Sequence, residues 1–455
     1  MKSILEEELI TYSKNVEFLK SIQGNILNKH GGGNELFIFL RFNQNPKEVR
    51  SLFANLPVKS AWDQYQSSNS YKKKGKLETF LGCYLSYSGY KYLQINDSEI
   101  PDDDAFRNGM ASRSLGDPPI TEWENLYQEN IHAIILLIDD NKADLNVELK
   151  KLETDWGSSI AGIQWGKKLQ NQHGQTIEHF GYVDGISQPI FFKDQYGKIS
   201  TNDFWDPKAK LCLALVKEPK SNSFGSYLVF RKLEQNVKAF KQAEEKLAHQ
   251  LGFIGETEEV AGALIIGRFE NGLPVVKYGS VPDPEAVFKD NDFDYSIDPD
   301  GSRCPYHAHI RKTNPRGDST RSFGSSFEDE RDHRIARRGI TYDDVGRNGD
   351  LTWHPDQGVG LLFLCFQSDI VNQFEFMQTF WANNNDFPKP FTGIDPVIGQ
   401  YKNREDSSGL DAEQKWRDIK GDQHCSSLSH FVNMKGGEYF FAPSIKFFKN
   451  LKTTK

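Results

Sequence analysis

Short apolar segments of strand length alternate with helix-length segments through both halves of the 455-residue chain, and this order constrains the fold most strongly. In the first half we predict helices at 46–66 and 143–155, and strands at 36–42, 79–86, 131–138 and 160–164. In the second half we predict helices at 234–250 and 370–381, and strands at 226–230, 360–366 and 438–441. Interleaving of this kind is typical of α+β domains, in which an antiparallel sheet carries helices on one face.

A polar, turn-rich stretch at 193–208 separates the two halves. A chain of this length favours two to three domains at about 150 residues each. We therefore predict an N-terminal domain over 1–205 and a C-terminal domain over 206–455.

Composition excludes several classes of protein. Lys and Arg number 55 against 63 Asp and Glu, a net charge of −8, which argues against nucleic-acid binding through bulk charge. The longest apolar stretches, 131–138 and 361–366, are far shorter than the ~20 residues of a membrane span. The first ten residues contain three Glu and no apolar core of a secretory signal. Five widely spaced Cys without a CxxC pair exclude a disulfide framework, so we expect a cytoplasmic protein with free thiols.

The pair His307-Ala308-His309 has three possible interpretations. In a strand, both imidazoles would face the same side and could bind one metal ion, as in some hydrolases. The cations that follow, Arg311, Lys312 and Arg316, instead favour an anionic ligand. Heme combines an iron that binds imidazole with two propionates that bind cations. An ordinary histidine beside a solvated basic loop is the third interpretation, and spacing alone does not choose among them.

Two further polar motifs also have more than one interpretation. Asp184 stands between Gly181 and Gly185 among apolar neighbours, which fits either an Asx-turn or a semi-buried carboxylate that serves as acid and base. Arg337-Arg338-Gly339 is either a basic turn or a segment that places an arginine to stabilise developing negative charge.

Taken together, eight segments resemble the dye-decolorizing (DyP-type) heme peroxidases, and they occur in the family's order from residue 22 to residue 444. They are IQGNIL at 22–27, AFRNGMASRSLGD at 105–117, EHFGYVDGISQP at 178–189, GSYLVFRKLEQNV at 225–237, DPDGSRCPYHAHIRKTNPR at 298–316, RRGITY at 337–342, GLLFLCFQSDI at 360–370 and GGEYFFAPS at 436–444. The chain length and the long insertions are similar to those of the larger, class V-like subgroup.

The resemblance implies a fold of two ferredoxin-like domains with heme b in the C-terminal half. It also implies a reaction in which hydrogen peroxide drives one-electron oxidation of bulky aromatic donors, such as dyes and phenols, through a ferryl intermediate. The partners would be these small molecules, with no nucleic acid and no membrane span, and the chain would be a monomer or a homodimer. A non-catalytic heme-binding or heme-delivery protein, and a metal hydrolase that uses His307 and His309, are the competing hypotheses.

Site residues follow from the motifs that match. His309 matches the axial ligand of the heme iron, Asp184 the distal aspartate and Arg337 the distal arginine. The resemblance also assigns heme-binding positions, with cations and an amide near the propionates and apolar residues on the distal wall, at Arg311, Asn314, Arg316, Leu361 and Phe363.

The arginine turn departs from the family pattern. Thr341 and Asp343 stand where the family usually has Pro and Gly. We therefore keep Arg334 and Arg338 as alternatives to Arg337.

Overall fold

The structure is a computed structural model that describes residues 3–75, 78–198, 205–279, 290–400, 414–417, 423–426, 428 and 430–452. In the N-terminal half, four antiparallel strands lie in the order β2-β3-β1-β4. Their bounds are β1 (Asn34–Leu40), β2 (Phe80–Leu85), β3 (Ala133–Asp139) and β4 (Ile160–Lys167). Helices α2 (Pro46–Asn55) and α3 (Ala61–Lys74) connect β1 to β2, and α6 (Lys142–Trp156) connects β3 to β4. This connection and strand order are those of a ferredoxin-like domain.

The C-terminal half repeats the same arrangement. Strands β8 (Phe224–Gln235), β10 (Ile340–Asp343), β11 (Val359–Gln367) and β14 (Val432–Ala442) lie in the order β10-β11-β8-β14. Between β8 and β10 come α8 (Val237–Leu251), α9 (Glu259–Ile266), α10 (His309–Thr313), α11 (Asp318–Phe323) and α12 (Phe327–Asp332). Two α+β units of one topology confirm the predicted fold class.

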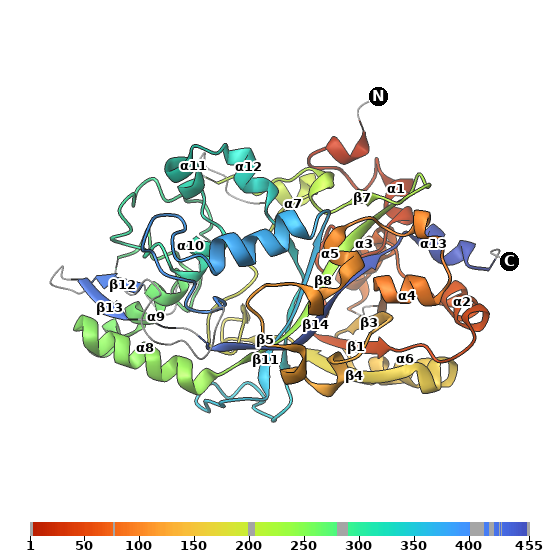
Figure 1. Cartoon of the computed structure of the whole chain (residues 1–455), viewed down its shortest axis with the longest axis horizontal. Coiled ribbons are helices and arrows are strands. Elements are labelled where there is room, and N and C mark those ends of the chain that lie inside the picture. Colours follow the sequence, from red (N-terminus) through yellow and green to blue (C-terminus); the bar gives the residue numbers. More distant parts are fainter. Residues whose placement is uncertain are drawn as a thin grey trace.

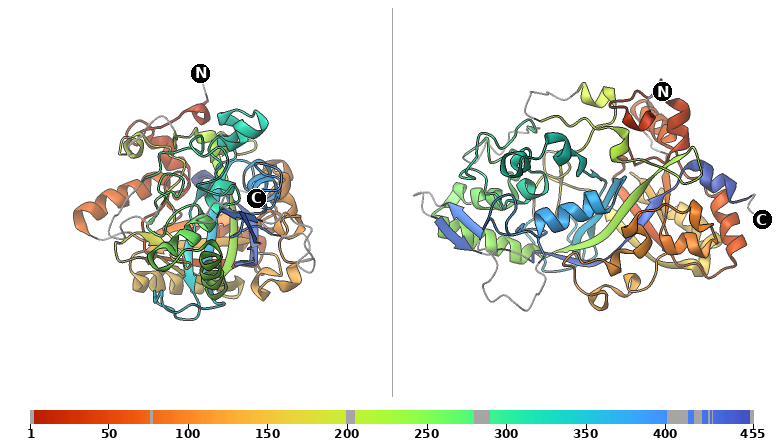
Figure 2. Two further views of the ribbon diagram at one scale, coloured as in Figure 1. Left: turned by 90° about the vertical axis from the view of Figure 1, so that its left-hand side faces the viewer. Right: turned by 45° about the horizontal axis from the view of Figure 1, so that its top comes forward.

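The two halves share one sheet. Phe441 of β14 pairs with Leu85 of β2, which joins the halves into a ten-stranded sheet within the described residues. The outer strands β4 and β10 also meet, because the Thr341 hydroxyl donates to the Lys167 carbonyl and the Gln164 amide donates to Asp344. In Figure 1, α2, α4 (Tyr87–Tyr92) and α6 lie at the right, and α8, α9 and α10 lie at the left, with the strands of the large sheet between. Both termini lie at the end that the N-terminal half forms (Figures 1 and 2).

Burial explains why the strands form where the sequence predicts them. All seven residues of β3 are buried, as expected for an apolar strand covered on both faces. The other strands are confirmed in position as well, although β8 and β14 are longer than predicted. The boundary at residue 205 stays a prediction.

Two helix predictions were wrong in detail. The helix over 46–66 is interrupted between α2 and α3, because Pro57 cannot donate a backbone hydrogen bond and disfavours helical geometry at Leu56. The segment over 370–381 forms π-helical turns at Val371–Glu375 and Met377–Ala382 instead of a regular α-helix.

No helix in the described part of the chain is both long and apolar enough to cross a membrane. Cys83, Cys212, Cys304 and Cys365 are free thiols, as expected.

Candidate active site

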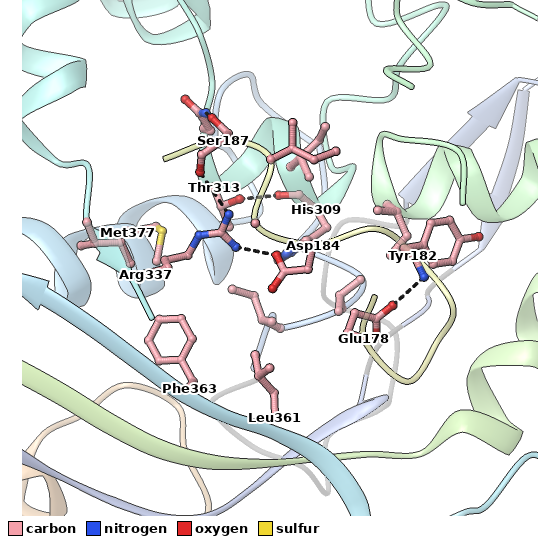
Figure 3. A pocket seen from close by; sticks show the side chains of 18 of the residues that line it. Glu178, Tyr182, Asp184, Ser187, His309, Thr313, Arg337, Leu361, Phe363 and Met377 are labelled. Atoms are coloured by element: carbon pink, nitrogen blue, oxygen red, sulfur yellow. Dashed lines mark hydrogen bonds and ion pairs between the residues drawn. The ribbon is translucent and has the colours of Figure 1, made fainter. Parts of the chain in front are cut away.

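A cavity of about 260 Å³ opens beside β11, β8 and the loop over 178–189, so residues from both halves of the chain line it. Seven of the eight predicted site residues line it: Asp184, His309, Asn314, Arg316, Arg337, Leu361 and Phe363. Figure 3 shows Leu361 and Phe363 rising from one strand toward Asp184 and Arg337. These two residues face the same side because side chains alternate along a strand.

Asp184 and Arg337 form an ion pair inside this cavity (Figure 3). The Arg337 Nη1 donates to Asp184 Oδ1 at 3.0 Å, and Nη2 donates to the Ser187 carbonyl at 3.2 Å. Gly181 and Gly185 have φ of 107° and 80°, so the loop turns on both sides of Asp184 in a conformation that favours glycine. The backbone of Arg337 is fixed by pairing of β9 (Ala336–Arg337) with β11.

The electrostatics of the pair favour an ionised aspartate. Burial raises the pKa of Asp184. The Arg337 guanidinium and the Lys29 ammonium together lower this pKa by more than burial raises it, so the net shift is downward. Asp184 therefore remains a proton acceptor in acidic solution, and both side chains stay 34% exposed to the cavity.

His309 opens α10 and lines the same cavity. Its Nδ1 lies 2.8 Å from Oδ2 of Asp395, whose side chain is fully buried. The other oxygen of Asp395 accepts from the backbone N–H groups of Val397 and Ile398. A carboxylate so held keeps the proton on Nδ1 and leaves the Nε2 lone pair available to a metal. Burial lowers the pKa of His309, but Asp395 raises it more strongly, so the net shift of the pKa is upward.

Three arginines of the described residues line the cavity without carboxylate partners there: the buried Arg268 and Arg316, and the partly buried Arg334. Arg268 and Arg316 donate to backbone carbonyls and share the Asn291 amide oxygen. None of the three forms an ion pair with a described carboxylate. Burial lowers the pKa of Arg316 and Arg334 to about 9 and that of Arg268 to about 10.

These residues fit a heme. Cations buried without anions are unfavourable unless a ligand supplies negative charge. Two propionates would supply it, while His309 offers Nε2 to iron. Asn314 adds an amide donor, which bonds to the Ser187 hydroxyl at 3.2 Å.

The structure does not bring Arg311 to the cavity, so its predicted contact with a propionate is corrected. Its side chain is fully buried, and its five N–H groups are directed to Asp298, Asp318 and the Cys304 carbonyl. The guanidinium has no donor left for a ligand. Arg311 instead holds together the loop that precedes α10.

The alternatives from sequence also have definite positions. His307 lies outside the cavity, and its ring packs against Trp416 with 4.3 Å between centroids, so it does not share a site with His309. Arg338 donates to the carbonyls of Asn25, Ile26 and Arg337 and faces away from Asp184. Arg334 lines the cavity but donates to backbone carbonyls.

The departures at Thr341 and Asp343 leave the Arg337 geometry intact. Thr341 bonds to Lys167 across the sheet edges, and Asp343 accepts from the backbone of Gly346, Arg347 and Asn348.

Sequence reasoning missed Asp395, Arg268 and Arg334. Asp395 lies 86 residues after His309 with no local pattern that connects the two. Arg334 was considered only as a substitute for Arg337. These arginines differ from the others that were considered because they line the cavity without a carboxylate partner among the described residues, and only the three-dimensional structure shows this.

Comparison with known proteins decides the family. A model described as the DyP dimeric alpha+beta barrel domain matches residues 21–167, and one described as Dyp-type peroxidase, C-terminal, matches 180–393. The multifunctional dye peroxidase of Amycolatopsis sp. is 41% identical over 95% of this chain and 96% of its own. The chain belongs to the DyP-type peroxidase family.

Solved structures agree with this assignment. A DyP-type peroxidase of Anabaena sp. superposes with a TM-score of 0.89 at 40% identity and covers 99% of both chains. A fungal DyP-type peroxidase of Auricularia auricula-judae gives 0.76 at 26% identity, over 95% of this chain and 99% of its own. The peroxidase is therefore a heme-dependent enzyme that acts on peroxide, as the resemblance implied.

Proposed function

We propose that this peroxidase uses hydrogen peroxide to oxidise bulky aromatic donors, such as dyes and phenols, by one electron at a time. For a donor AH the balance is H₂O₂ + 2 AH → 2 H₂O + 2 A•. One observation carries the proposal: a single cavity is lined by the Asp184–Arg337 pair and by His309, whose ring is held from behind by the buried Asp395. The names of the relatives, which include dye peroxidases, support the donor class.

We assign the cofactor as heme b, with His309 Nε2 as the protein ligand to iron. Heme supplies the redox chemistry, because it accepts oxidising equivalents from peroxide and passes them on singly. Arg316, Arg268 and Asn314 would bind the propionates. Leu361 and Phe363 give the wall near Asp184 an apolar surface, which would limit the access of water.

Asp184 and Arg337 would cleave peroxide together. Asp184 accepts the proton from one peroxide oxygen and returns it to the other, which then leaves as water. Arg337 stabilises the negative charge that develops as the O–O bond breaks. The ion pair already places both groups at one point of the cavity, so no large rearrangement is needed.

An absorption spectrum of the purified, heme-loaded protein tests this function. We expect a Soret band that changes on addition of peroxide and returns when a phenol or an anthraquinone dye is added, with bleaching of the dye. A protein that retains heme but shows no change with peroxide would contradict the proposal and support the heme-binding alternative.

We also propose that the enzyme acts in the cytoplasm as a monomer or a homodimer. The free thiols at Cys83, Cys304 and Cys365 are consistent with a reducing compartment. Light scattering on the purified protein decides between the two assemblies.

A further inference from the structure

The proposed reaction takes up protons at the two oxygens of peroxide, and the inference below rests on that proposed function. Reduction of peroxide follows H₂O₂ + 2 e⁻ + 2 H⁺ → 2 H₂O. Transfer of a proton by Asp184 between the two peroxide oxygens leaves the number of protons unchanged. The two donors release two protons on oxidation, so no proton is consumed overall, but two protons must be delivered to the distal side of the cavity in each turnover.

A second, much smaller cavity adjoins the first at Asp184. Its volume is about 10 Å³, which is close to the space that one water molecule needs. Glu35, Lys29 and Lys168 line it together with Asp184. The two cavities therefore share the carboxylate that would handle protons.

Glu35 on β1 is a carboxyl group at a buried position. It is 2% exposed, and its Oε2 has no hydrogen-bond partner among the described residues. Burial raises the pKa of Glu35 to about 7, although Lys29 and Lys168 lower it. A carboxyl group of this kind holds a proton in mildly acidic solution and releases it near neutrality.

Lys29 lies where the small cavity meets the exterior. Lys29 is exposed, and its Nζ donates to the Gly339 carbonyl at 2.8 Å. Its ammonium interacts electrostatically with both Glu35 and Asp184. Lys168, which is partly exposed, donates to the Gly31 carbonyl at the same edge.

The other titratable groups that face Glu35 do not serve as carriers. Glu178 lines both cavities, and burial raises its pKa to about 7 as well. Both of its oxygens accept hydrogen bonds, from the backbone N–H groups of Phe180 and Tyr182 and from Gln235, so it lacks the unpaired oxygen that Glu35 offers. Tyr84 on β2 is fully buried, and burial raises the pKa of its phenol, so it stays neutral.

We propose that Glu35 stores a proton and relays it through the small cavity to Asp184. In each step the Glu35 carboxyl releases one proton, which passes by way of water to the Asp184 carboxylate and from there to the oxygen being reduced to water. The Glu35 carboxylate then takes a proton from solvent past Lys29. Glu35 acts only through Asp184, so it is a positioning residue rather than a catalytic one.

Glu35→Gln in the heme-loaded full chain tests the relay, because glutamine keeps the size and cannot release a proton. We expect the peroxide step to keep its rate in stopped-flow measurements. The later reduction by a saturating phenol should slow by roughly tenfold below pH 7, less than the 10²–10⁴ typical of direct acid–base groups. Above about pH 7, where Glu35 is ionised, wild type and variant should converge. Glu438→Gln is the matched control, since Glu438 is a half-buried carboxylate outside both cavities.

Infrared titration gives a readout that does not depend on turnover. A protonated-carboxyl band that titrates near neutral pH should lose intensity in Glu35→Gln and keep it in Glu438→Gln. Equal reduction rates of wild type and Glu35→Gln at every pH, or an unchanged band, would overturn the relay. Absence of any peroxide reaction in the wild type would instead overturn the proposed function.

Lys29→Met provides a second route if Glu35→Gln does not fold. Loss of this cation should raise the pKa of Glu35, so the pH at which phenol-dependent reduction slows should move upward. An unchanged pH dependence in a folded Lys29→Met variant would also overturn the relay.

Discussion

Replacement of Arg337 by leucine tests the charge-stabilising part of the site. Arg337 Nη1 lies 3.0 Å from Asp184 Oδ1, so a peroxide that exchanges a proton with Asp184 would lie within about 4 Å of the guanidinium. Two unit charges at 4 Å interact by about 4 kcal/mol at an effective dielectric constant of about 20. Loss of one donor of this type typically slows a reaction about 10²–10³-fold, or about 2.7–4 kcal/mol. We expect a decrease of that size in the peroxide step.

Stopped-flow measurement of the peroxide step is the assay. Heme content should not change, because His309 and Asp395 make no contact with Arg337 through hydrogen bonds. Removal of Arg337 also raises the pKa of Asp184, so the acidic limb of the rate profile should move to higher pH. Arg41→Leu, at an arginine paired with Glu129 outside the cavity, controls for loss of charge. An unchanged rate in Arg337→Leu would refute the reasoning and point to Arg334.

Three further variants probe other parts of the site. Asp184→Asn should retain heme and lose the acidic limb of the pH–rate profile of the peroxide step. Wild-type dye turnover should be fastest in mildly acidic solution and fall toward neutral pH. A wild-type peroxide rate in Asp184→Asn would mean that Asp184 only shapes the cavity. Asp395→Asn should weaken heme binding about 10–100-fold, as loss of a group that orients a metal-binding histidine does, and heme titration measures it. Arg311→Leu leaves Asp298 buried without its cation and leaves Asp318 with Arg321 alone, so urea unfolding should show a loss of about 3–5 kcal/mol, with heme content per folded molecule unchanged.

The sequence predicts the fold well where apolar patterning is strong. The strand at 131–138 is almost entirely apolar, and β3 forms there with every residue buried. The strand β10 was not predicted, because its four residues, ITYD, carry too short a pattern. Its position depends on pairing with β11 and on contact with β4.

The candidate site was predictable where one motif carries one role. His309, Asp184 and Arg337 each lie in a distinct segment, and the fold brings all three to one cavity. The role of Arg311 was not predictable, since a cation two residues after a histidine can face either a ligand or the interior. Asp298 and Asp318 decide the matter, and only the fold shows that their carboxylates meet Arg311.

The central claim is that His309 is the protein ligand of the heme iron. The most direct measurement compares the ratio of Soret absorbance to absorbance at 280 nm in His309→Ala and His307→Ala, both purified with heme supplied. We predict that His309→Ala loses most of its heme and that His307→Ala keeps a wild-type ratio, because of these two histidines only His309 lines the cavity. Loss of heme from His307→Ala with retention in His309→Ala would contradict this claim.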